Sequence, residues 1–135
     1  MGLGARGEET QMVSSYNDLQ VWQRSMAFVK QVYEATKTFP KDELYALTNQ
    51  LRRAAVSIPS NIAEGHARDS TKEFLHHLSF ALGSLAEVET QLILAQDLQY
   101  LPKESLLSLI QESTEIGRML RGLQKSLQRK LAPSP

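Results

Sequence analysis

The sequence predicts an all-α protein, an up-down-up-down antiparallel four-helix bundle. Three observations lead to this fold class. Apolar residues recur at alternating steps of three and four along four long segments. The joints between these segments are short and rich in helix breakers, which favours antiparallel neighbours. No alternation of apolar and polar residues of the kind typical of strands competes with the helical pattern.

The first two predicted helices are separated by a break at Phe39-Pro40, because proline pushes the preceding residue out of the helical conformation. Asn17, with Gln20 three residues on, matches a capping box for the first helix. The second helix is expected from about Lys41 to Gly65, since glycine accepts the left-handed conformation that ends many helices. The expected core stripes are Leu19, Trp22, Met26, Val29, Tyr33 and Thr36, then Leu44, Leu47, Leu51, Ala54, Ile58 and Ile62.

The third and fourth predicted helices have clearer boundaries. Ser70, with Glu73 three residues later, forms a capping box, and Pro102 suits the first position of the last helix. The expected core stripes are Phe74, Leu78, Ala81, Leu85, Val88, Leu92 and Ala95, then Leu106, Leu109, Ser113, Ile116, Leu120, Leu123 and Leu127. We expect disordered segments over residues 1–15 and 131–135, with the bundle spanning residues 16–130.

The composition is that of one ordinary globular domain. The 135 residues are 41% hydrophobic and 22% charged, and the net charge is zero, so any nucleic-acid partner would have to bind a local patch. The absence of cysteine excludes disulfides and thiolate metal sites. Residues 1–13 lack the apolar stretch of a signal peptide, and no apolar run approaches the ~20 residues of a membrane span. We therefore expect a cytoplasmic protein without a membrane partner.

An unusual run in the second helix places a proline, two serines and an asparagine among apolar residues. Pro59 cannot donate a hydrogen bond to the carbonyl group of Ala55, which costs about 3 kcal/mol inside a helix. On a structural interpretation, the polar side chains satisfy freed backbone groups or bond to a facing helix, where Ser79 and Ser84 are candidates. On a functional interpretation, Arg53, Asn61 and Glu64 form a polar site. The residues of this motif are Arg53, Ser57, Pro59, Ser60, Asn61, Glu64 and Gly65.

Several segments together resemble a known family. They are Asp18–Gln23, then Tyr33, Thr36 and Phe39-Pro40, the run Arg53–Gly65, Lys72–Phe74, Ala81–Leu85 and Glu87. The chain is similar over about residues 16–128 to the bacterial four-helix-bundle family that is also called the 23S rRNA-intervening sequence proteins. The resemblance is specific because the thirteen contiguous residues Arg53–Gly65 have such an uncommon composition.

The resemblance implies a four-helix bundle that assembles into a symmetric ring, a homopentamer, with no enzymatic activity attached to it. A relative of the family is the accessory protein of diversity-generating retroelements, which works with a reverse transcriptase and binds nucleic acid. RNA and a reverse transcriptase are therefore the implied partners. This chain departs from that accessory protein, which is strongly basic, because its own net charge is zero.

The end of the fourth predicted helix is the best electrostatic indication of a nucleic-acid site. Residues 116–135 contain five cations and no acid, so they carry +5 and the rest of the chain carries −5. The five cations are Arg118, Arg121, Lys125, Arg129 and Lys130. One interpretation is that they form a phosphate-binding ridge. The other is that they are present because the helix dipole favours positive charge near a helix C-terminus. No aromatic residues interleave with them to stack on bases.

No motif indicates catalysis, a cofactor, a metal or a small-molecule substrate. Glu73 and His76 have the Glu-x-x-His spacing of di-iron bundles, but the second copy that such a site requires is missing. We expect Glu73 and His77, four residues apart, to form a surface pair instead.

The third predicted helix has apolar residues beside its core stripe, Leu75, Leu82 and Ile93, which predicts a surface covered by sister subunits. The leading hypothesis is a non-enzymatic, homo-oligomeric module that binds or scaffolds RNA or a ribonucleoprotein. The alternative is a structural or protein-interaction ring without affinity for nucleic acid.

Overall fold

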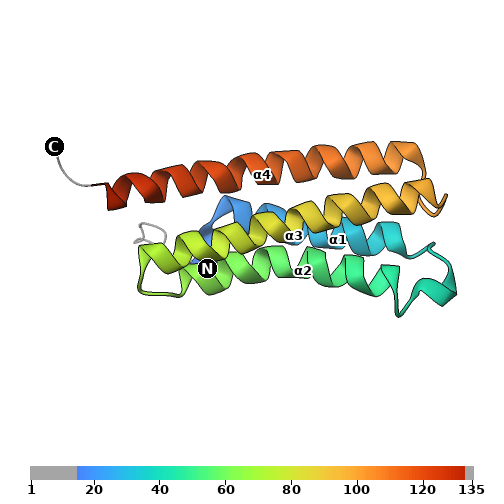
Figure 1. Ribbon diagram of the computed structural model, residues 1–135, viewed down its shortest axis with the longest axis horizontal. Coiled ribbons are helices and arrows are strands. Elements are labelled where there is room, and N and C mark those ends of the chain that lie inside the picture. Colours follow the sequence, from blue (N-terminus) through green and yellow to red (C-terminus); the bar gives the residue numbers. More distant parts are fainter. Residues whose placement is uncertain (1–14, 133–135) are drawn as a thin grey trace.

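The computed structural model describes residues 15–132 and confirms an all-α four-helix bundle, with no strand in that part of the chain. A short 3-10 turn, η2 (Tyr16–Asp18), precedes α1 (Gln20–Thr36). A second turn, η3 (Lys41–Glu43), leads to α2 (Leu47–His66). α3 (Thr71–Asp97) and α4 (Lys103–Leu131) complete the bundle, and the four long helices alternate in direction (Figure 1). Most of the residues predicted to be disordered, 1–14 and 133–135, lie outside the described residues. The prediction is wrong for Leu131, which is the last residue of α4.

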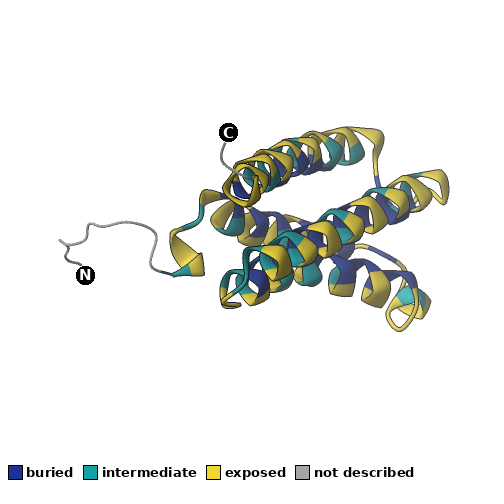
Figure 2. Cartoon of the chain, turned by 60° about the vertical axis from the view of Figure 1, so that its left-hand side comes forward, coloured by how far each residue is buried: buried dark blue, intermediate teal, exposed yellow. Residues whose placement is uncertain are grey.

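The core is mainly apolar, and each of the four long helices contributes several residues to it. α2 packs most extensively on α3. α1 packs on both α2 and α4, and α3 also packs on α4. Buried positions face the bundle interior, and exposed positions form continuous outer stripes (Figure 2). The largest fully buried side chains are Phe28, Val32, Leu51, Ile58, Ile62, Leu78, Val88, Leu92, Ile116 and Leu120.

The beginning of α3 and the joint to α4 are made by local sequence. The Ser70 hydroxyl accepts a hydrogen bond from the Glu73 amide at 3.2 Å, which confirms Ser70 as the N-cap of this helix. At the other end, Gln99 adopts a left-handed conformation, with φ of 68°. The amides of Gln99 and Tyr100 then donate to the carbonyl oxygens of Gln96 and Ala95. This is a Schellman motif, so the turn is closed by a residue other than glycine.

Two predicted boundaries are wrong because other contacts replace the expected caps. Asn17 lies in the η2 turn, and α1 begins at Gln20 after Leu19, without a side-chain cap. α2 begins at Leu47 and not near Lys41, and the Glu43 carboxylate accepts a hydrogen bond from the Leu47 amide at 3.2 Å. Glu43 therefore satisfies a helix amide from the preceding turn.

The predicted core faces hold for most of α2, α3 and α4 and for part of α1, where Thr36 is buried as predicted. Three other predicted positions of this stripe are partly buried against the core: Leu19, Trp22 and Val29. In α1, Met26 and Tyr33 are exposed, and Leu44 precedes α2 and is also exposed. The observed core positions of α1 are Val21, Ser25, Phe28, Val32 and Thr36. Apolar side chains cover two adjacent faces of α1, and contact with the neighbouring helices selects the one that the sequence pattern did not favour.

Gly65 lies inside α2 and does not end it. It is buried, and a Cβ atom placed there would lie 2.6 Å from the His77 Cβ and 3.0 Å from Phe74 Cδ1. The residue is therefore glycine because α2 and α3 approach closely here, and the predicted left-handed helix end is wrong.

Candidate nucleic-acid interface

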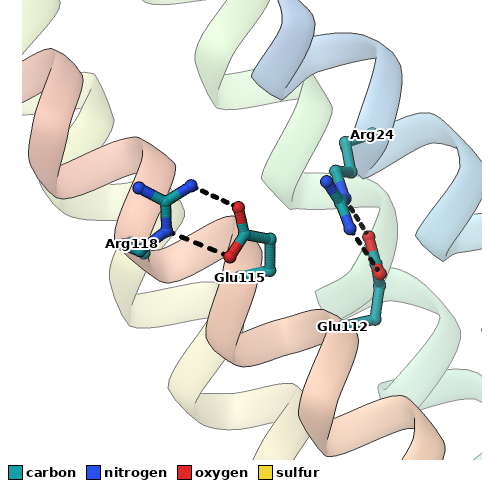
Figure 3. A network of polar contacts seen from close by, with 4 residues as sticks. All are labelled: Arg24, Glu112, Glu115 and Arg118. Carbon is teal, nitrogen blue, oxygen red and sulfur yellow. Dashed lines mark hydrogen bonds and ion pairs between the residues drawn. The ribbon is translucent and has the colours of Figure 1, made fainter.

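Of the five predicted cations on α4, Arg118 is already paired with an acid. Its guanidinium group donates two hydrogen bonds to the Glu115 carboxylate, one of them Nε to Oε1 at 3.0 Å (Figure 3). This pairing raises the pKa of Arg118 and lowers the pKa of Glu115. A phosphate group that binds Arg118 would therefore compete with Glu115, although an exposed ion pair of this kind is weak.

Arg121 is exposed, and its guanidinium group folds back over Gly117 of α4. Its Nη1 lies 3.1 Å from the position that a Cβ of the buried Gly117 would occupy. The guanidinium group therefore lies over Gly117, at the mouth of a crevice between α3 and α4. Within residues 15–132, no carboxylate lies within 4.0 Å of it.

The remaining three cations, Lys125, Arg129 and Lys130, are exposed and form what we call the basic end of α4. The end of α4 projects past the start of α3 (Figure 1). In the described part of the chain, none of the three has an acidic partner within 4.0 Å. The basic end can therefore accept phosphate groups without breaking an existing ion pair.

The α2 motif divides into an inner and an outer half. The Ser57 hydroxyl donates to the Ala54 carbonyl oxygen at 2.7 Å and also bonds to Ser84 of α3. The Asn61 amide donates to the Ser57 carbonyl oxygen at 2.9 Å, and its Oδ1 lies 3.2 Å from His77 Nδ1. These contacts favour the structural interpretation, with Ser84 as the partner across the interface between α2 and α3, which we call the α2–α3 seam.

The outer half of the motif makes no such side-chain hydrogen bonds to residues 15–132. Pro59 is buried within α2, whereas Arg53, Ser60 and Glu64 are exposed on its outer surface. The closest charged contact of this group is Glu64 Oε1 to His77 Nδ1 at 3.8 Å. Ser79 does not bond to the motif, because its hydroxyl donates to the Leu75 carbonyl oxygen and accepts from Gln124 of α4.

The histidine segment lies on α3, and within residues 15–132 no group of three or more His, Cys, Asp or Glu side chains is placed to hold a metal ion. The predicted pairing of Glu73 with His77 is wrong. Glu73 lies 3.8 Å from Arg68, while His77 turns toward Asn61 on α2. His77 therefore belongs to the α2–α3 seam, because the two helices approach closely beside Gly65.

α3 is the most apolar helix and leaves part of its apolar surface in solvent. Phe80, Ile93, Leu94 and Leu98 are each 45–48% exposed. By length and composition, it is the one helix of residues 15–132 that could cross a membrane, contrary to the expectation from the sequence. A bundle-core helix meets the same criteria, and seven residues of α3 are buried in this core.

The four-helix architecture agrees with comparisons to known proteins. The profile of the 23S rRNA-intervening sequence proteins matches residues 17–122. The chain belongs to this family. A crystal structure at 1.70 Å from Bacteroides thetaiotaomicron, described as a protein of unknown function from the S23 ribosomal protein family, is similar. It is 27% identical, with a TM-score of 0.73, and the match covers 82% of this chain and 97% of that one. A search of curated proteins gives no match.

Sequence reasoning about this family member missed the crevice between α3 and α4. Ser113 was expected in the core stripe, and it is buried, but its hydroxyl group donates to the carboxylate of Glu89 on α3. The available signal was a serine in an otherwise apolar stripe, facing a helix that carries a glutamate. Only the helix register shows that the two side chains meet.

Proposed function

We propose that this protein is a non-enzymatic, homo-oligomeric four-helix bundle that binds RNA through the basic end of α4. The observation that carries the proposal is the group of Lys125, Arg129 and Lys130, exposed and without acidic partners in the described chain. The interaction of a helix dipole with cations, worth about 0.3–1 kcal/mol each, explains cations in the last turn. It does not explain the absence of any acid after Glu115.

Self-association supports the binding role because it multiplies a small basic surface. The exposed apolar side chains of α3 would be covered in a symmetric assembly, for which the family resemblance implies a pentamer. Three cations per subunit would then recur around a ring and contact several phosphates of one strand. A reverse transcriptase or another protein of a ribonucleoprotein is the partner class that the resemblance adds.

Salt dependence is the direct test of RNA binding. With three phosphate contacts per site, the affinity for a single-stranded RNA should fall roughly twenty-fold between 50 and 200 mM salt. The double variant Lys125→Glu with Arg129→Glu should lose most binding and flatten this dependence. Fluorescence anisotropy with a labelled oligouridine measures both effects.

The single reversal Lys125→Glu should also weaken binding, and its matched control is Lys103→Glu, which makes the same charge change at the exposed opposite end of α4. The control should bind RNA like the unmodified protein. If the unmodified protein does not bind RNA at low salt, the alternative of a protein-interaction ring is supported and the RNA role is lost. Binding that survives the double reversal would place the RNA site elsewhere.

Self-association is tested separately by light scattering at micromolar concentration. Phe80→Asp combined with Leu94→Asp should convert the oligomer to monomers, since both side chains lie on the outer surface of α3. Leu107→Asp is the control, because Leu107 is 57% exposed on α4 and outside that surface. A stable monomer for the unmodified protein would overturn the assembly proposal.

A further inference from the structure

A crevice of about 260 Å³ lies between the middle of α3 and α4, beside the basic end. Its apolar wall consists of Leu82, Leu85 and Ala86 from α3. The polar groups at its surface are Glu89 of α3 and Ser113, Thr114 and Arg121 of α4. Gly117 of α4 also lines the crevice, and its lack of a side chain leaves room for the Arg121 guanidinium group.

The two charged groups of this crevice have opposite sign but do not pair. The Glu89 carboxylate accepts a hydrogen bond from the buried Ser113 hydroxyl through Oε2, which fixes the position of the acid. Arg121 lies against Gly117 and more than 4.0 Å from any carboxylate in residues 15–132. A fixed acceptor and a planar donor group therefore line one small space and remain available to a ligand.

This combination selects a ligand with hydrogen-bond donors on one edge and acceptors on the neighbouring edge. An ionised carboxylate only accepts hydrogen bonds, and a guanidinium group only donates them. Guanine has donors at N1 and N2 on its Watson–Crick edge and acceptors at O6 and N7 on its Hoogsteen edge. Adenine has an acceptor at N1 instead, which a carboxylate repels.

We propose that the crevice binds a guanine base of single-stranded RNA. Glu89 accepts hydrogen bonds from N1–H and N2–H, Arg121 donates to O6 and N7, and the leucine side chains contact the face of the base. Lys125 follows Arg121 by one helical turn, so the flanking phosphates reach the basic end while the base occupies the crevice. This inference rests on the proposed RNA binding and adds base specificity to it.

The test compares two single-stranded RNAs that differ at one base, a guanine or an adenine within an oligouridine tract. We expect the guanine RNA to bind about ten-fold more tightly to the unmodified protein, and replacing guanine by inosine, which lacks the N2 amine, to remove part of that advantage. Glu89→Gln should abolish the guanine preference, but the salt dependence should remain. Glu87→Gln, an exposed acid of α3 outside the crevice, is the matched control and should keep the preference.

The outcomes separate this inference from the proposed function. Equal, salt-dependent binding of both RNAs overturns the guanine site and leaves the RNA role intact. No binding of either RNA overturns both. A guanine preference that persists in Glu89→Gln places base recognition outside the crevice, and circular dichroism of the variant verifies that it is folded. The comparison of the two RNAs on the unmodified protein needs no variant at all.

Discussion

The α2–α3 seam and the α1–α4 seam are built on different principles. Between α2 and α3, Gly65 allows close approach, and the short side chains of Ser57 and Ser84 bond directly across the seam. Between α1 and α4, the long side chains of Arg24 and Glu112 span the gap (Figure 3). Open hollows of about 640 and 450 Å³ lie along that second seam.

This difference indicates that the α2–α3 interface contributes more to stability and that the α1–α4 interface tolerates more change. Small residues bring two backbones together and exclude water, so each contact is short and intolerant of added volume. A solvated ion pair such as Arg24–Glu112 tolerates changes in helix spacing and contributes little net energy. We expect substitutions at the first seam to be costly and substitutions at the second to be mild.

The largest effect is expected at Gly65. Gly65→Ala places a Cβ 2.6 Å from the His77 Cβ, and neither atom can rotate away. Overpacking of this kind exceeds the gain in helix propensity, so the free energy of unfolding should fall by about 2 kcal/mol. The measurement is chemical denaturation followed by circular dichroism.

Gly83→Ala is the matched control for this prediction. Gly83 lies inside α3 with nothing within 4 Å of its Cβ position, so alanine should stabilise the protein by up to about 1 kcal/mol. Equal stability changes for the two variants would contradict the close approach of α2 and α3.

A smaller effect is expected for the hydroxyl pair of the same seam. Ser57→Ala removes the bond to Ser84 and the bond to the Ala54 carbonyl oxygen, which should cost about 1 kcal/mol. A double-mutant cycle with Ser84→Ala isolates the energy of the pair. Ser60→Ala is the control, since this serine is exposed on the same helix and should change stability by less than about 0.5 kcal/mol. A coupling energy of zero would show that the two hydroxyl groups do not interact in solution.

The smallest effect is expected at the α1–α4 seam. Arg24→Gln removes the ion pair with Glu112 and should lower the thermal midpoint slightly at low salt and not at all at 1 M salt. Lys30→Gln, on the same helix and exposed, is the control for charge alone. A loss as large as that of Ser57→Ala, or one that persists at high salt, would contradict the proposed difference between the seams.

Local signals predicted the elements whose contacts are close in sequence. The Ser70 N-cap and the stripes of α3 and α4 were correct because the signals that predict them repeat within one or two turns of the same helix. Asn17, Leu44 and Gly65 were interpreted incorrectly, and for Gly65 the groups that decide its role lie on another helix. Gly65 has the sequence signature of a helix end, but His77 and Phe74, more than eight residues away, set its actual environment.

The candidate site shows the same division. Five cations without an acid after Glu115 can be read directly from the chain, but their availability depends on their neighbours. Arg118 pairs with Glu115 on its own helix, and Arg121 folds over Gly117 toward a crevice that α3 completes. Side-chain partners across a helix interface depend on register and rotation, which one-dimensional spacing does not specify.

Amino-acid sequence alone determined the helical class, the four segments, the family and the excess of positive charge at the end of α4. Those properties depend on periodicity and composition, which are local. The tertiary structure decided which face of α1 is buried, why residue 65 is glycine, and that Glu89 and Arg121 line one crevice without pairing. Each of these depends on how far apart two helices lie and how each is rotated, and only the packing of the whole core determines those quantities.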